Sequence, residues 1–219
     1  MQPIIRPPKK EILRLMAGFR RFKERFFSAD STLYNKLSSI GQRPKTLVIS
    51  CSDSRVDPAI LFNLSPGEVF VVRNVANLVP PCENHTSFHG VSAAIEFAVV
   101  NLQVESIIIL GHRQCGGIRS LFQPQNVREG GFVQQWMSIA KEAKERSIKL
   151  VGDDDFEKLC RTCEQESIQT SIQNLKSFPF VAEAINSNKL QIFGVYFDIE
   201  EGQLWSIDEA TNSFQLLLK

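Results

Sequence analysis

The chain has 219 residues, which suits one domain of ordinary to large size with a core that needs no disulfide staples. Its 25 basic and 24 acidic residues nearly balance, so the charge favours neither a nucleic-acid nor an anionic-membrane partner. The opening residues MQPIIRPPKK lack the apolar segment of a secretory signal, and no apolar run approaches about 18 residues. We therefore expect a cytoplasmic protein whose five cysteines are metal ligands, catalytic groups or buried apolar residues.

Residues 9–28 carry apolar side chains at helical spacing, with basic residues on the opposite face. This helix has two interpretations: a membrane-surface or targeting segment, or an arm that packs on the body or on a partner subunit. Glu11 and Glu24 favour the arm, because transit peptides are poor in acidic residues. We assign residues 1–40 to the arm and residues 41–219 to a single α/β domain.

The next segments alternate between two types. TLVISC (46–51) and EVFVVRN (68–74) are apolar and β-branched, with a helix-length piece between them. SFHGVSAAIEFAVVNL (87–102) has the pattern of a buried helix and leads into the strand-like run ESIIILGH (105–112). Apolar strands that alternate with helices predict a mostly parallel central sheet flanked by helices.

The second half begins with helical patterns, from about residue 131 to residue 188. Two strands, at 190–199 and 203–208, then close the chain. The short link Glu201–Gly202 between them predicts a terminal hairpin. Neither repeats nor a linker interrupt this single α/β domain.

Directly after the first strand, CSDSRVDP places Cys51, Asp53 and Arg55 on alternate residues. Alternate residues of an extended segment point the same way, so these three side chains are expected to converge at the strand end. A thiol, a carboxylate and a guanidinium gathered at one point indicate a binding or catalytic site.

A second polar stretch, GHRQCGG, follows the strand that ends near residue 112 and contains His112 and Cys115. In open α/β sheets, sites form at the carboxyl ends of the strands. Each residue alone has an ordinary interpretation, as a core cysteine or a surface histidine. With Cys51, however, two thiolates and an imidazole match the ligand preference of Zn²⁺, and a catalytic zinc site keeps its fourth position for water.

The two motifs at this distance resemble the zinc motifs CxDxR and HxxC of the β-class carbonic anhydrases. PGEVFVVRNVANLVPP, GVSAAIEFAVVNL and CRTCEQESIQTSIQNLKSFPFV extend the likeness to the plant-type and related bacterial branch, over about residues 10–208. The resemblance implies a β-carbonic-anhydrase-like fold and an enzyme that hydrates CO₂ reversibly to bicarbonate and a proton, with metal-bound hydroxide as nucleophile.

The resemblance also assigns roles to individual residues. Cys51, His112 and Cys115 would hold one Zn²⁺ per chain, and Asp53 and Arg55 would form the catalytic dyad. Asp53 is itself a hard anionic ligand, and a guanidinium can hold a carboxylate at two points. We therefore expect a switch in which Asp53 bound to Arg55 is the active arrangement and Asp53 on the metal is the inactive one.

The family's substrate pocket maps onto Gln42, Phe70, Val75 and Gly116, some of them contributed by a partner subunit. The resemblance implies a homodimer or a dimer of dimers, with the active site at the subunit interface. CO₂ and bicarbonate are then the small-molecule partners, and neither nucleic acid nor membrane is expected.

Some members of the family carry an inhibitory bicarbonate pocket built on a Trp, a Tyr and an Arg. The first two places hold Val48 and Phe197 here, and only Arg73 has a counterpart. We therefore expect no such regulation and an open, water-bound zinc at neutral pH. Arg113 replaces a usual Ser after His112, and Phe97 replaces a Tyr near the pocket. Arg113 could add a positive charge near the mouth of the pocket or point to solvent, and we favour solvent.

The remaining metal-capable side chains have several interpretations. Cys160 and Cys163 could be redox-active, or join Cys82 and His85 in a second zinc site, but their helical setting favours buried helix cysteines. His85 and His89 are candidates for proton transfer or ordinary loop residues.

Three rival functions stay open beside CO₂ hydration. One is hydrolysis of carbon disulfide or carbonyl sulfide at the same centre. Another is a structural zinc protein, which would not need Asp53 and Arg55. The third, a nucleotide-binding module, lacks the GxGxxG spacing.

Overall fold

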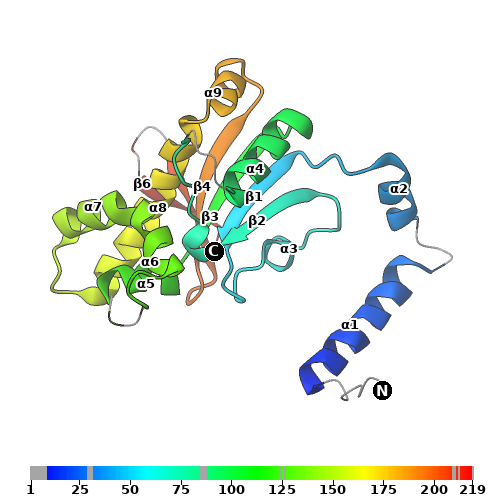
Figure 1. Cartoon of the computed structure of the whole chain (residues 1–219), viewed down its shortest axis with the longest axis horizontal. Helices are drawn as coiled ribbons and strands as arrows, with labels where there is room; N and C mark the ends of the chain where they lie inside the picture. The colour runs from blue at the N-terminus through cyan, green and yellow to red at the C-terminus, as the bar shows by residue number, and fades with distance from the viewer. Residues whose placement is uncertain are drawn as a thin grey trace, which may run out of the picture. The chain divides into compact units, whose positions relative to one another are not determined.

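The structure is a computed structural model that describes residues 9–28, 32–83, 88–123, 125, 127–208, 211 and 213–218. The chain divides into two compact units, residues 1–43 and residues 44–219 (Figure 1). Each is described separately.

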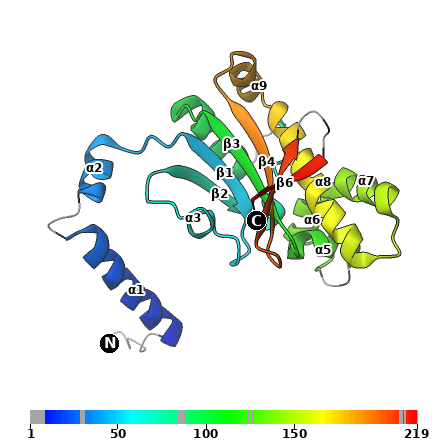
Figure 2. The ribbon, with the colours of Figure 1, turned by 180° about the vertical axis from the view of Figure 1, so that it is seen from behind.

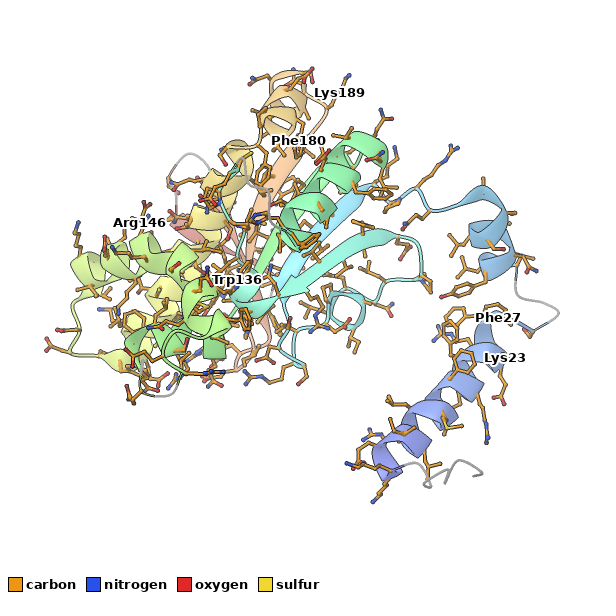
Figure 3. The ribbon with its side chains drawn as sticks, in the orientation of Figure 1. Lys23, Phe27, Trp136, Arg146, Phe180 and Lys189 are labelled. Atoms are coloured by element: carbon orange, nitrogen blue, oxygen red, sulfur yellow. The ribbon has the colours of Figure 1, made fainter. Side chains whose placement is uncertain are left out.

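The first unit contains helix α1 (Lys10–Phe26), as its apolar spacing predicted, and helix α2 (Leu33–Ile40), which we did not predict. Aromatic rings join the two helices: Phe27 and Tyr34 stack with ring centroids 4.9 Å apart (Figure 3). No residue of α1 is buried within the chain. Leu15 and Phe19 belong to the apolar stripe of this helix, and each is more than 60% exposed.

The second unit is built on a six-stranded sheet in the order β2-β1-β3-β4-β5-β6 (Figures 1 and 2). Its strands are β1 (Thr46–Cys51), β2 (Val69–Asn74), β3 (Ser106–His112), β4 (Gln191–Asp198), β5 (Gln203–Asp208) and β6 (Ser213–Leu218). The first four strands in this sheet order run parallel, whereas β5 and β6 are antiparallel to their neighbours. This confirms the mostly parallel sheet and the hairpin of β4 and β5, although that hairpin is not the end of the sheet.

Strand β6 corrects our expectation that the chain closes with two strands. It pairs with β5 and forms an edge of the sheet. Only Phe214 is half-buried, and it packs edge-on against Tyr196 with ring centroids 6.0 Å apart. The other five residues of β6 are exposed, so no alternation of buried and polar positions marks the strand in the sequence.

Helices and short helical turns connect the strands. They are α3 (Pro58–Leu61), η1 (Val75–Asn77), α4 (Gly90–Glu96), the π-helical η2 (Phe97–Asn101), α5 (Gly116–Phe122), α6 (Phe132–Met137), η4 (Ser138–Ala140), α7 (Lys141–Val151), α8 (Phe156–Lys176) and α9 (Pro179–Asn186). Among the residues described, no helix is both long and apolar enough to span a bilayer.

The two faces of the sheet are covered unequally. Ile49 and Ile109 point to one face and pack in the main core with Ile168 of α8 and with residues of α4 and α9. Val48 and Leu110 point to the other face, beside the residues around α3. Side chains alternate between the faces because successive residues of a strand point in opposite directions.

A third apolar cluster lies beyond the carboxyl ends of the strands, where α5, α6 and α7 gather (Figure 1). Its members include the side chains of Cys51 and Cys115 together with Met137 and Cys163. Strands β1 and β3 are direct parallel neighbours, with Ser50 opposite Leu110. The sheet therefore brings the ends of these two strands together at the edge of this cluster, as expected for a site in an open α/β sheet.

Candidate metal centre and active site

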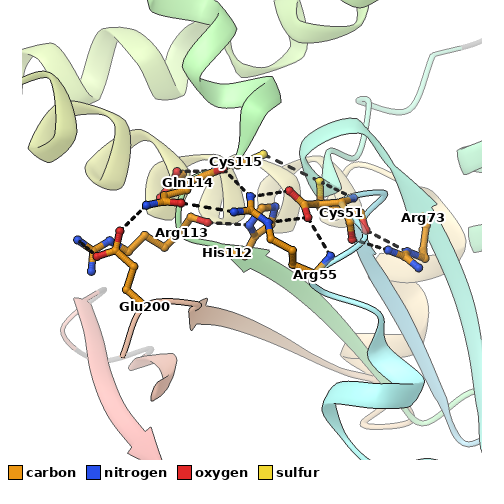
Figure 4. Close-up of polar contacts among 10 residues, drawn as sticks. Cys51, Arg55, Arg73, His112, Arg113, Gln114, Cys115 and Glu200 are labelled. Atoms are coloured by element: carbon orange, nitrogen blue, oxygen red, sulfur yellow. Dashed lines mark hydrogen bonds and ion pairs between the residues drawn. The ribbon is translucent and has the colours of Figure 1, made fainter. Parts of the chain in front are cut away.

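Cys51, His112 and Cys115 meet at one point. Their candidate ligand atoms all lie within 4.8 Å of one another, and the three residues are at most 6% exposed. Cys51 ends β1, His112 ends β3, and Cys115 follows in the turn before α5 (Figure 4). The structure thus brings together the three ligands predicted from the two motifs.

The geometry of this cluster fits a tetrahedral zinc ion. The two sulfur atoms lie 4.0 Å apart, close to the separation of about 3.8 Å that two Zn–S bonds of about 2.3 Å give at a tetrahedral angle. His112 Nδ1 lies 2.8 Å from the carbonyl oxygen of Arg113, so this nitrogen carries the proton. Nε2 is buried and has no hydrogen-bond partner among the residues that the structure describes, as expected of a nitrogen whose lone pair binds a metal.

The two thiols differ in acidity when no metal is bound. The hydrogen bond from Cys115 lowers the pKa of Cys51 to about 4. The same contact and burial raise the pKa of Cys115 well above its usual value. Of the two thiols, Cys51 is therefore the one that ionises more readily, and a metal held by both sulfur atoms would displace the proton that remains on Cys115.

Asp53 and Arg55 form a two-point ion pair beside the ligands. Arg55 Nε lies 3.0 Å from Oδ1 of Asp53, and Nη2 lies 2.8 Å from Oδ2. The backbone N–H of Arg55 donates a further hydrogen bond to Oδ1 at 2.9 Å. These contacts lower the pKa of Asp53 to about 2, so the carboxylate stays charged and acts as an acceptor.

Arg73 holds the loop that carries this pair. Its guanidinium donates to the carbonyl oxygens of Cys51 at 3.0 Å and of Asp53 at 2.6 Å, and it pairs with Asp57 at 2.6 Å. Asp57 in turn caps α3 by accepting the backbone N–H of Ala59. We did not predict this positioning role of Arg73 from the sequence. The role follows from the strand register, which places Arg73 of β2 opposite Ser50 of β1.

Two of the three places compared above with the inhibitory bicarbonate pocket hold apolar residues. Val48 is 1% exposed and shares an apolar cluster with Phe197. Arg73 is engaged by the three oxygens just named. The side chains of Val48 and Phe197 offer bicarbonate no polar group, and the absence of this regulation stays a prediction.

Glu164 is a second residue that sequence reasoning missed. This carboxyl group of α8 is 2% exposed, and it accepts the backbone N–H of Cys115 at 2.9 Å and the hydroxyl of Tyr196 at 2.8 Å. Burial raises its pKa to about 7. Glu164 thereby fixes the backbone of a candidate zinc ligand without belonging to the cluster of Cys51, His112 and Cys115. In the sequence, Glu164 looks like any other glutamate of a helix. Its supporting role becomes visible only when the structure shows that it lies on the buried face of α8.

Arg113 departs from our expectation that it points to solvent. Its guanidinium pairs with Asp198 at 3.1 Å and with Glu200 at 2.7 Å, and its side chain is 26% exposed. Its backbone N–H also donates to the carbonyl of Phe197 at 2.9 Å. Arg113 therefore fastens the metal-binding turn to the end of β4.

Two of the four residues assigned to the substrate pocket lie together. Val75 and Gly116 line the same hollow of about 270 Å³ beside α5. Trp136 of α6 donates its indole N–H to the carbonyl of Val75 at 2.8 Å and so fixes this wall (Figure 3). Phe70 packs instead against Phe97, with ring centroids 5.9 Å apart.

Gln42, the fourth pocket residue, is exposed and belongs to the first compact unit. Cys160 and Cys163 are buried on α8, as expected of helix cysteines, and burial raises the pKa of both thiols. In the part of the chain that the structure describes, Cys51, His112 and Cys115 are the only metal-capable group of three or more. The alternative ligand His85 lies outside the described residues, whereas His89 lies inside them, just before α4.

Comparisons with known proteins agree with this site. The family model described as carbonic anhydrase matches residues 46–204. The chain is 40% identical to β carbonic anhydrase 3 of Arabidopsis thaliana over 209 residues, which cover 93% of this chain and 80% of that protein.

Solved structures give the same result. The structure of the β-carbonic anhydrase CcaA superposes with a TM-score of 0.87 at 31% identity, and it covers 95% of this chain and 100% of that chain. One of two tetrameric β-carbonic anhydrases of Sordaria macrospora gives 0.78 at 29% identity, over 91% and 98% of the two chains. The chain therefore belongs to the β-carbonic anhydrase family.

Proposed function

We propose that this chain catalyses the zinc-dependent, reversible hydration of CO₂ to bicarbonate and a proton, with Asp53 and Arg55 as its catalytic dyad. The observation that carries the proposal is the buried Cys51–His112–Cys115 cluster, in which His112 Nε2 has no hydrogen-bond partner within the described part of the chain. A purely structural zinc site would have no use for the adjacent ion pair of Asp53 and Arg55.

Cys51, His112 and Cys115 would hold one Zn²⁺ per chain. When bound, zinc lowers the pKa of a coordinated water toward about 7 and so supplies a nucleophile at neutral pH. Asp53 has a carboxylate free to accept a hydrogen bond and orient that nucleophile, because its low pKa keeps it ionised. Arg55 keeps this carboxylate in place, so Asp53 does not itself occupy the fourth position of the site.

Substrate binding would use the four residues assigned by family resemblance: Gln42, Phe70, Val75 and Gly116. The hollow that Val75 and Gly116 line also carries Val127 and Val133 beside polar side chains such as Arg119, so it offers apolar surface to a small molecule such as CO₂ next to hydrogen-bonding groups. Phe70 and Gln42 would complete the pocket, in part from a partner subunit.

We further propose that the chain works as a homodimer or a dimer of dimers. The exposed apolar stripe of α1, which includes Leu15 and Phe19, is unusual for a monomer in water. Residues 1–40 would act as the arm that covers this stripe against a partner, and residues 41–219 as the zinc-binding catalytic domain. The tetrameric enzymes of Sordaria macrospora are similar in fold and support an oligomer.

The proposal is tested by comparing zinc-loaded and chelator-treated protein at one pH. Stopped-flow measurement with a pH indicator should show rapid CO₂ hydration only for the zinc-loaded form, with one zinc per chain. Carbon disulfide and carbonyl sulfide serve as parallel substrates. Rapid turnover of either one without CO₂ hydration would replace the proposed function by the related hydrolysis.

A further inference from the structure

The metal-binding turn contains a glutamine that faces the catalytic pair. Gln114 stands between the ligands His112 and Cys115, and its side chain extends toward Arg55 (Figure 4). Its Oε1 accepts a hydrogen bond from Arg55 Nη1 at 3.4 Å, and its backbone carbonyl accepts one from Nη2 at 3.2 Å. Arg55 is therefore held by Asp53 on one side and by Gln114 on the other.

Gln114 is itself fixed from behind. Its side-chain amide donates a hydrogen bond to Oε1 of Glu200, which lies just after the end of β4. The other carboxylate oxygen of Glu200 binds Arg113 Nη2 at 2.7 Å. Glu200 thus holds two consecutive residues of the turn. Hydrogen bonds link Glu200 through Gln114 to Arg55 (Figure 4), and Arg55 in turn binds Asp53.

The backbone at Gln114 is strained, with a φ of 59° in the left-handed region. A residue with a side chain pays on the order of 1 kcal/mol for this conformation, whereas glycine adopts it freely. A glycine would relieve the strain but could not reach Arg55 or Glu200. The strained backbone at Gln114 is therefore offset by hydrogen bonds to Arg55 and Glu200 that only a side chain at this position can make.

Arg55 needs such support because its side chain is 47% exposed. A half-exposed ion pair gains little energy by itself, since water competes for both charges and the long arginine side chain loses conformational freedom. The two extra hydrogen bonds that the guanidinium donates to the fixed turn restrict it to the orientation in which it holds both oxygens of Asp53.

We propose that Gln114, held by Glu200, is a positioning residue that braces Arg55 against Asp53 and keeps the carboxylate from reaching the metal site. The inference deepens the proposed function and rests on its dyad. The inference predicts that residues outside the dyad help to keep Asp53 bound to Arg55 and away from the metal site.

The test uses the zinc-loaded, full-length Gln114→Ala variant with Gln103→Ala as its matched control. Gln103 is also a glutamine with a left-handed backbone, φ 55°, but it is exposed in the segment before β3. The two substitutions therefore remove the same side chain at the same kind of backbone position. Glu200→Ala removes the brace from its far end, and Glu200→Gln should restore part of it because an amide oxygen still accepts from Gln114.

The first readout is the crystal structure of each zinc-loaded variant near pH 7. We expect Asp53 to remain on Arg55 in the wild type and in Gln103→Ala, and to leave Arg55 for the metal in at least a fraction of the Gln114→Ala molecules. The second readout is the pH profile of CO₂ hydration. At pH 7, kcat of Gln114→Ala should fall about tenfold, with a smaller change in KM, and it should recover at higher pH.

Two results would overturn the inference: Asp53 on Arg55 in every Gln114→Ala molecule, or a pH profile that matches that of Gln103→Ala. Failure of the proposed function would look different. A wild type that hydrates no CO₂ would refute that function, while the position of Asp53 in the variant crystals would still decide whether Gln114 braces Arg55.

Discussion

Arg55 grips the carboxylate of Asp53 with two side-chain nitrogens, Nε at 3.0 Å and Nη2 at 2.8 Å, although the two residues lie only two positions apart in the chain. The backbone N–H of Arg55 adds a third contact at 2.9 Å. Contacts between two residues of the same loop thus fix the conformation of the loop after β1. It presents the carboxylate in one orientation beside the buried cluster of Cys51, His112 and Cys115.

Replacing Arg55 should separate metal binding from catalysis. We expect Arg55→Ala to keep one zinc per chain, because no ligand is changed, and to lose about 100-fold in kcat at pH 7 as Asp53 is released. Arg55→Lys, which offers one point of contact instead of two, should fall between the wild type and alanine. Zinc content by atomic absorption and stopped-flow hydration are the measurements; unchanged activity in Arg55→Ala would refute the dyad.

Removal of a ligand should abolish both properties at once. We expect Cys51→Ser to lose zinc and CO₂ hydration, and to unfold at a lower temperature than the zinc-loaded wild type, because zinc stabilises only the folded chain. Cys82→Ser is the matched control, since Cys82 is half-buried and outside the ligand cluster. Zinc loss in the control would instead point to a second site that includes Cys82.

Glu164 provides a test of support from outside the ligand set. Glu164→Ala would leave the N–H of Cys115 and the hydroxyl of Tyr196 buried without an acceptor, and should lower the free energy of unfolding by about 2–4 kcal/mol. Glu164→Gln retains an acceptor for Cys115 and should lose less.

The measurement for Glu164 is urea denaturation of the zinc-loaded proteins, together with zinc affinity from competition with a chelator. Zinc affinity should fall in Glu164→Ala by about 10-fold or more, as for other residues that support metal ligands. If both variants match the wild type in free energy of unfolding and in zinc affinity, Glu164 does not hold the turn that carries Cys115.

The ion pair of Asp53 and Arg55 should make stability depend on pH in acid. Arg55 lowers the pKa of Asp53 to about 2, whereas a free aspartate titrates near 4. The folded chain therefore binds fewer protons than the unfolded chain in this range, so the stabilisation is complete above about pH 4 and is lost as the pH falls toward 2.

The comparison for this pH dependence is between the wild type and Asp53→Asn, both freed of metal so that zinc release does not contribute. The advantage of the wild type in unfolding free energy should shrink by about 1 kcal/mol between pH 5 and pH 2, a modest amount because Arg55 is half exposed. A difference that is constant over this range would contradict the lowered pKa.

Much of the fold could be predicted because local patterns match the elements that formed. The run TLVISC became β1 without a change of boundary, and Glu201–Gly202 joins the antiparallel pair of β4 and β5. Strand β6 escaped because its residues are mostly exposed, and α2 because its eight residues carry only a short pattern.

The cluster of candidate ligands was predictable for a similar reason. Cys51 and His112 end neighbouring parallel strands and Cys115 lies in the turn that follows, so the sheet topology brings the three residues together. The supporting residues were not. Arg73, Glu164 and Glu200 lie on β2, on α8 and after β4, and their roles depend on distances across the fold that no spacing in the sequence contains. Arg113 was misjudged because its partners, Asp198 and Glu200, are more than 80 residues away.

The most direct test of the account is stopped-flow CO₂ hydration by the zinc-loaded wild type from about pH 6.5 to 9, with zinc measured per chain. The account predicts one zinc and substantial activity already at pH 7, because Arg55 holds Asp53 away from the metal. Activity that begins only above about pH 8 would contradict the open site, and one zinc with no hydration at any pH would contradict the proposed function.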